Sequence, residues 1–145
     1  RIEWTSMQLY RNGSNYDYSY NYALRLDAKS GQMLYDCSFK APTNLNDDIW
    51  RCELESVPVT REELAPLDAL IQGLPLAPPK EPAPVDDDLL VCDETNEIFD
   101  VRISNYKDKS VKKLTAPLSG EQRAEMQKLF LRLYMKAKDR APVHN

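Results

Sequence analysis

The sequence predicts an α+β fold, in which an antiparallel β-sheet of about six strands carries two α-helices packed on one of its faces. Three observations support this. Stretches of alternating polar and apolar residues precede each of two helical patterns, as expected for strands with one buried face. Each helical pattern opens with a capping box, and short turns rich in glycine or asparagine separate the strands. Because 145 residues can bury one substantial core, we expect a single domain over residues 1–145.

Four strands are predicted in the first part of the chain, over residues 2–11, 16–26, 32–40 and 49–57. The second alternates most regularly, and its apolar face carries Tyr16, Tyr18, Tyr20, Tyr22, Leu24 and Leu26. A turn ending at Gly31 joins it to the third strand, which places Met33, Tyr35, Cys37 and Phe39 on one face. In the fourth strand, Trp50, Cys52 and Leu54 share a face.

The first helix is predicted to follow Pro58, because Thr60 and Glu63 have the spacing of a capping box. Its apolar positions recur at helical spacing and are Leu64, Leu67, Ile71 and Leu74, with Gly73 as the cap at the end. Pro66 conflicts with a regular helix because it lacks an N–H group. The helix therefore either begins near Glu63, with Pro66 in its first turn, or is kinked at Pro66.

Residues 74–88 contain five of the ten prolines and end in three aspartates, so we expect a Pro-rich surface connection within the domain. A second hairpin is predicted from residues 89–94 and 97–106, with Phe99, Val101 and Ile103 facing inward. A short strand over residues 111–116 follows. Ser119 and Gln122 then open the longest helix, which runs to about Asp139. Its apolar face is Met126, Leu129, Phe130, Leu133, Tyr134 and Ala137.

The composition argues against several kinds of chemistry. The net charge of −4 argues against a nucleic-acid binder, which usually displays a concentrated basic face. His144 is the only histidine and lies next to the C-terminus, so histidine-based catalytic triads and metal sites are not expected. With four glycines, the chain has no phosphate-binding loop. We therefore expect no catalytic residues, no metal site and no cofactor.

The three cysteines are Cys37, Cys52 and Cys92, which are too few and too widely spaced for a disulfide framework or a zinc site. Each lies in an apolar context, as a small buried residue would. Cys37 and Cys52 pair only if their strands are neighbours and the compartment is oxidising.

Tyr16, Tyr18, Tyr20 and Tyr22, which we call the tyrosine row, are the one feature that suggests a binding site. Tyr20 and Tyr22 continue into Leu24 and Leu26, so we expect both to belong to the core. Tyr16 and Tyr18 lie near the turn, where a strand of average length ends. These two tyrosines are our candidates for stacking on a ligand, although a buried strand face explains the row as a whole better.

The stretches YSYNYALRLDAKSGQMLY and VTREELAPLDALI resemble parts of uncharacterised extracytoplasmic domains and lipoproteins of bacteria. This resemblance implies an α+β fold and a secreted or envelope-anchored location, and it transfers no functional residue. The chain begins at Arg1 rather than at methionine. We therefore expect that a leader, a membrane tether or another domain has been removed from its N-terminal side.

Three functional hypotheses follow. The first is a non-catalytic binding or interaction domain of a secreted or envelope-tethered bacterial protein, with an unknown protein or glycan as ligand. The second is an intracellular inhibitor or immunity-type protein whose acidic loops bind a basic partner. The third is a carboxylate-dependent hydrolase, for which acids at residues 47–48, 86–88 and 93–94 are available in predicted loops.

Overall fold

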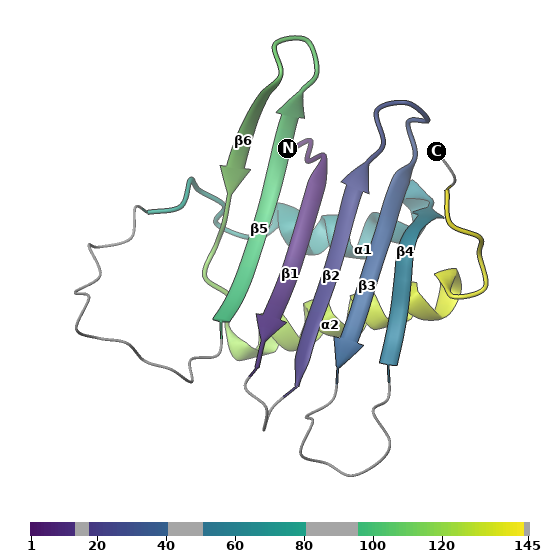
Figure 1. The fold of residues 1–145 in the computed structure, drawn as a ribbon. Helices are drawn as coiled ribbons and strands as arrows, with labels where there is room; N and C mark the ends of the chain where they lie inside the picture. The colour runs from purple at the N-terminus through teal and green to yellow at the C-terminus, as the bar shows by residue number, and fades with distance from the viewer. Residues whose placement is uncertain (14–17, 41–50, 81–95, 144–145) are drawn as a thin grey trace, which may run out of the picture.

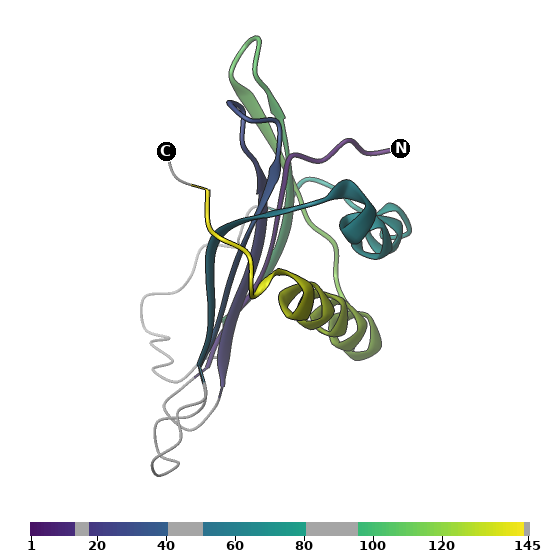
Figure 2. The same cartoon turned by 90° about the vertical axis from the view of Figure 1, so that its right-hand side faces the viewer.

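The computed structural model describes residues 1–13, 18–40, 51–80 and 96–143, and within them the chain forms two layers (Figure 1). One layer is a six-stranded antiparallel sheet in the order β4-β3-β2-β1-β5-β6. The other consists of two helices, which cover the same face of the sheet (Figure 2). The predicted α+β class is confirmed.

The first four strands form an antiparallel meander. They are β1 (Ser6–Asn12), β2 (Ser19–Leu26), β3 (Met33–Lys40) and β4 (Arg51–Val59). The register places Tyr22 of β2 between Leu9 of β1 and Cys37 of β3. All three side chains are buried, so the predicted alternation is confirmed in the middle of the sheet. At the turn between β2 and β3, Gly31 has a φ of 71°, which only glycine adopts readily.

The prediction of a first strand starting at residue 2 is wrong. Strand β1 begins at Ser6, and the preceding residues lie against a helix. The indole Nε1 of Trp4 donates to Asp68 Oδ1 at 2.8 Å. The side-chain amide of Gln72 accepts from the Ile2 N–H at 2.9 Å and donates to the Ile2 carbonyl at 2.8 Å. The apolar alternation of Ile2 and Trp4 therefore reflects packing on a helix rather than strand pairing.

A β-bulge interrupts the pairing of β3 with β4 opposite Asp36. Ser56 has a φ of 53° there, an unusual value for a residue with a side chain. Its N–H donates to Asp36 Oδ1 at 2.9 Å, and Arg25 donates to its Oγ at 2.6 Å and also contacts Asp36. These polar contacts hold the bulge on the face of the sheet that the helices leave uncovered.

Helix α1 (Arg61–Gln72) begins with the predicted capping box of Thr60 and Glu63. Because the helix starts at Arg61, Pro66 does not lie in its first turn, and the alternative that placed it there is wrong. Gly73 caps the C-terminal end with a φ of −88°, a value that does not require glycine. The four predicted apolar positions, Leu64, Leu67, Ile71 and Leu74, are all buried.

Strand β5 (Asn96–Asn105) lies between β1 and β6 (Ser110–Leu114). Phe99 and Val101 are buried on the helix side, as predicted, whereas Ile103, predicted to face inward with them, is only half-buried. The proposed hairpin partner over residues 89–94 lies outside the described residues. At the start of the proline-rich segment, Ala77 forms an isolated antiparallel bridge with Thr115, just beyond β6.

Helix α2 (Gly120–Ala137) opens with the predicted capping box of Ser119 and Gln122 and ends slightly before the predicted Asp139. Its buried residues are Met126, Phe130, Leu133 and Ala137. Figure 2 shows α2 beside α1, with one end of the sheet extending past it. After α2 the chain returns to β4, where the Val143 N–H donates to the Ser56 carbonyl at 2.8 Å.

Candidate functional site at the exposed end of the tyrosine row

The tyrosines of the tyrosine row differ in how far they are buried. Tyr22 and Tyr20 are 0% and 2% exposed, so the prediction that both belong to the core is confirmed. Tyr18 is 38% exposed just before the start of β2. Tyr16 lies outside the described residues, so its role as a ligand-stacking residue stays a prediction. Of the two candidates, Tyr18 is the one that the structure places.

An aromatic series connects Tyr18 to the centre of the core. The ring of Tyr22 stacks on Phe130 of α2, with 5.1 Å between centroids and 8° between planes. Tyr20 follows at 5.2 Å from Tyr22, and Tyr18 at 6.0 Å from Tyr20. Such offset contacts are favourable for aromatic rings. The exposed ring is therefore the last member of a series whose first members are fully buried.

Two further side chains contact the Tyr18 ring. The ring of Phe39 lies 6.1 Å away at an angle of 19°, and the Arg11 guanidinium carbon lies 4.2 Å from the Tyr18 centroid. The same guanidinium donates to the Tyr18 backbone carbonyl at 2.6 Å. A cation over an aromatic face is attracted by the ring quadrupole. The orientation of Tyr18 is therefore set before any ligand arrives.

Charged groups surround this end of the sheet. Glu97 of β5 lies 3.3 Å from Arg11 Nε and 2.8 Å from Arg123 Nη1, so its carboxylate joins β1 to the first turn of α2. Burial raises the pKa of Tyr20, and a hydrogen bond with Arg123 offsets part of this rise. The Tyr20 hydroxyl therefore stays protonated near neutral pH. We call Tyr18, Phe39, Arg11, Glu97 and Arg123 the Tyr18 cluster.

The Tyr18 cluster has the parts of a binding surface. An aromatic face supplies apolar contact. A carboxylate can accept hydrogen bonds from a ligand, and two guanidinium groups can donate them. Sequence reasoning identified Tyr18 but missed Arg11, Glu97 and Arg123. These three residues lie far from one another in sequence. The pairing of β1 with β2 and β5 places Arg11 beside Tyr18 and Glu97, and the packing of α2 on the sheet adds Arg123.

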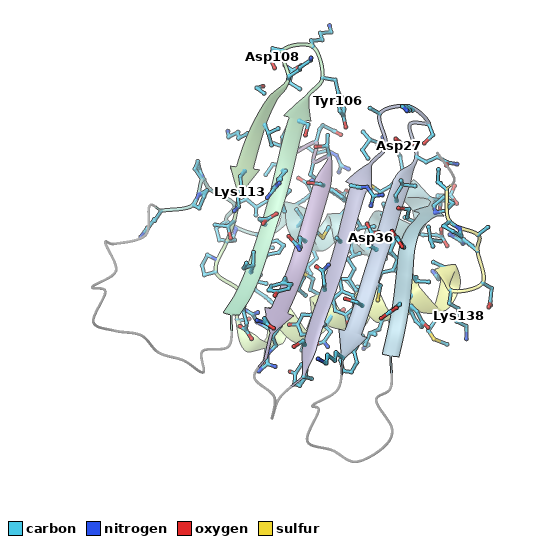
Figure 3. The ribbon with its side chains drawn as sticks, in the orientation of Figure 1. Asp27, Asp36, Tyr106, Asp108, Lys113 and Lys138 are labelled. Atoms are coloured by element: carbon cyan, nitrogen blue, oxygen red, sulfur yellow. The ribbon has the colours of Figure 1, made fainter. Side chains whose placement is uncertain are left out.

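The described carboxyl groups with a shifted pKa show no sign of a general acid, whose pKa would be raised. Ser30 lowers the pKa of Asp27, and Ser110 lowers that of Asp108, in turns at the other end of the sheet (Figure 3). The pKa values of Glu63 and Asp68 are also lowered. The acids at residues 47–48, 86–88 and 93–94, on which the hydrolase hypothesis rests, lie outside the described residues.

Of the two cysteine side chains that could form a disulfide, the described residues include only one. Cys37 is buried in β3 and lies opposite Leu54, whereas Cys52 lies opposite Phe39. The side chain of Cys52 and the whole of Cys92 lie outside the described part, so a disulfide between Cys37 and Cys52 stays a prediction. Within the described ranges, no group of three or more histidine, cysteine, aspartate or glutamate residues could hold a metal ion.

A hollow lies where the N-terminal residues lie against α1. It measures about 200 Å³, and its lining includes Trp4, Met33, Leu64 and Asp68. Burial alone would raise the pKa of Asp68, but hydrogen bonds from Trp4, Gln72 and Arg1 lower it. The carboxylate therefore already has several donors. We interpret this hollow as part of the attachment of the N-terminal residues.

Comparisons with family models, curated proteins and solved structures found no match to this chain. No described helix is both long enough and apolar enough to span a bilayer. Proposals about function therefore depend on the geometry of the described residues and on the sequence resemblance.

Proposed function

We propose that this chain is a non-catalytic binding domain of a secreted or envelope-tethered bacterial protein, and that the Tyr18 cluster contacts its ligand. The observation that carries the proposal is that the Tyr18 ring is both exposed and fixed in orientation. The ring is 38% exposed, yet Phe39, Tyr20 and Arg11 hold it in place. A fixed aromatic side chain loses little conformational entropy on binding.

A glycan is the ligand class that best matches the polar groups of the cluster. A sugar ring presents an apolar face of C–H groups and a rim of hydroxyls. The face suits an exposed tyrosine ring, and the hydroxyls can donate to a carboxylate and accept from a guanidinium. The side chains of Glu97 and Arg123 are 34% and 26% exposed. Both therefore remain accessible to a ligand at the edge of Tyr18.

The test is a glycan array probed with the purified chain, followed by titration of any bound glycan. Tyr18→Ala is expected to weaken binding at least about fivefold, if a sugar ring stacked on the tyrosine contributes as a stacked base does, on the order of 1–3 kcal/mol. Tyr106→Ala is the matched control. Tyr106 is 53% exposed in the turn after β5, at the opposite end of the sheet (Figure 3).

Two outcomes would contradict the proposal. One is that no glycan binds on the array and that the tyrosine fluorescence of the chain does not change when glycans are added. The other is a bound glycan that Tyr18→Ala and Tyr106→Ala affect equally. The proposed location is tested separately by the full-length gene product. A leader that ends in a lipid-accepting cysteine supports it, and an in-frame cytoplasmic start contradicts it.

A further inference from the structure

The outward side of α2 carries a regular series of positions that are exposed, except for Leu131, which is half-buried and packs partly against the core. These positions are spaced alternately by three and four residues, and they are Glu121, Ala124, Lys128, Leu131, Met135 and Lys138. This is the spacing of a coiled-coil seam. Met135 is 59% exposed, and Leu131 is half-buried. Ala124, Lys128, Leu131 and Met135 also line a shallow groove of about 410 Å³.

This seam is complementary to itself when two copies run antiparallel. Pairing Ala124 with Met135 of a second copy sets a small side chain against a large one. In the same register, Lys128 lies opposite Leu131, where its aliphatic stem can cover the leucine while the ammonium group stays in water. Glu121 then lies opposite Lys138, with opposite charges. Because the arrangement is symmetric, each of these contacts occurs twice.

The flank of the seam repeats the same pattern. Glu125 and Arg132 each follow a seam position by one residue, so they occupy equivalent places beside it. In an antiparallel pair, equivalent flanking positions face each other, and Glu125 of one copy meets Arg132 of the other. Both residues are exposed. Within one helix they are seven residues apart, about 10 Å along the axis, which is too far for a direct ion pair.

We infer that α2 mediates a reversible homodimer in which the two helices pack antiparallel through this seam. The acids at its N-terminal half and the bases at its C-terminal half favour a second copy over a uniformly acidic partner. Figure 2 shows the outward side of α2 facing away from the sheet and from α1. With few apolar layers, the dimer is expected to dissociate in the micromolar range, at interface sizes typical of transient complexes.

The test uses the whole chain and a charge exchange. Glu125→Arg places like charges opposite Arg132, and Arg132→Glu places like charges opposite Glu125. Each single variant is expected to weaken dimerisation about tenfold, since two ion pairs become two repulsive contacts. An equimolar mixture of the two variants restores complementary pairs at both sites. The double variant restores complementary pairs between two identical copies. Sedimentation equilibrium at increasing protein and salt concentrations measures the wild-type chain, the two single variants, their mixture and the double variant.

Lys107→Glu is the control, because Lys107 is exposed in the turn between β5 and β6 and the charge change equals that of Arg132→Glu. It is expected to dimerise as the wild-type chain does. Circular dichroism of each variant checks that the exposed substitutions leave the fold intact. A wild-type chain that stays monomeric at high micromolar concentration would overturn the inference. So would single variants that dimerise like the wild type, or a mixture no stronger than its components.

Discussion

The two helices begin alike and differ in what their polar side chains do. Both open with a capping box, and both bury an apolar face against the same side of the sheet. Helix α1 holds residues near both ends of the chain. Its Asp68 and Gln72 bind the N-terminal residues, and its Glu63 forms two hydrogen bonds of 2.6 Å with Arg140, beyond α2.

Helix α2 instead carries the aromatic centre of the core. Phe130 is fully buried, stacks on Tyr22 and lies 6.0 Å from the Tyr35 ring, whose hydroxyl donates to the Phe130 carbonyl. The outward side of α2 holds the exposed seam described above. The comparison shows that α1 holds residues near both ends of the chain through polar contacts. Helix α2 contributes mainly aromatic packing, with an ion pair from Arg123 to Glu97, and leaves its outward side exposed.

Truncation of Phe130 tests the packing role of α2 and should have the largest effect. Phe130→Ala removes a fully buried ring and its two aromatic contacts, so we expect a loss of about 3–5 kcal/mol in the free energy of unfolding. Met135→Ala, on the outward side of the same helix, should change it by less than about 0.5 kcal/mol in the monomer. Urea denaturation at low protein concentration measures both. A loss of similar size in the two variants would contradict the assignment.

The stability of the protein at acid pH tests the contact between Glu63 of α1 and Arg140, which follows α2. Hydrogen bonds from Arg140 lower the pKa of Glu63 from 4.5 to about 2. Because the folded-state pKa is the lower one, this stabilisation is complete above pH 4.5 and is lost as the pH falls toward 2. The expected loss is on the order of 2 kcal/mol over that range.

The matched variants are Arg140→Met and Arg61→Met. Arg140→Met removes the partner of Glu63, so its unfolding free energy should depend less on pH below 4.5. Arg61 is exposed in the first turn of α1, and its replacement should leave the acid dependence unchanged. Urea denaturation across this pH range measures both. An Arg140→Met chain with the wild-type acid dependence would show that Glu63 is not the group responsible.

Removal of Asp68 tests the attachment of the N-terminal residues and should have the smallest effect on global stability. Asp68→Ala removes the acceptor of the Trp4 indole and of Arg1, at a cost of about 1 kcal/mol. The larger change should be local, with faster hydrogen exchange at residues 1–4. Asp139→Ala, an exposed acid after α2, is the control. Unchanged protection of residues 1–4 would mean that Gln72 and packing suffice to hold them.

Local features of the fold were predictable because their determinants are close in sequence. A capping box needs only two residues three positions apart, and both boxes lie where the pattern placed them. The buried faces of β2, β3 and α1 followed from periodicity in the same way. The strand predicted from residue 2 failed because Ile2 and Trp4 satisfy the alternation by contacting Gln72 and Asp68, which lie 70 and 64 residues away.

The candidate site shows the same division. Alternation identified four tyrosines on one strand face, but it could not say which ring would be covered, because coverage depends on where α2 crosses the sheet. Phe130 covers Tyr22, whereas Tyr18 lies near the end of the sheet that extends past α2. The contacts of Arg11 with Glu97 and Tyr18 depend on strand order, which no local pattern specifies.

The sequence by itself determined the class of the fold, the helix starts and the apolar faces, because each depends on interactions within a few residues. Only the tertiary structure decided the order of the strands and the position of residues 1–4. It also decided the contact of Arg140 with Glu63 and the exposure of Tyr18. These depend on side chains brought together from distant segments, and the free energy that selects among such arrangements comes from burying the whole core at once.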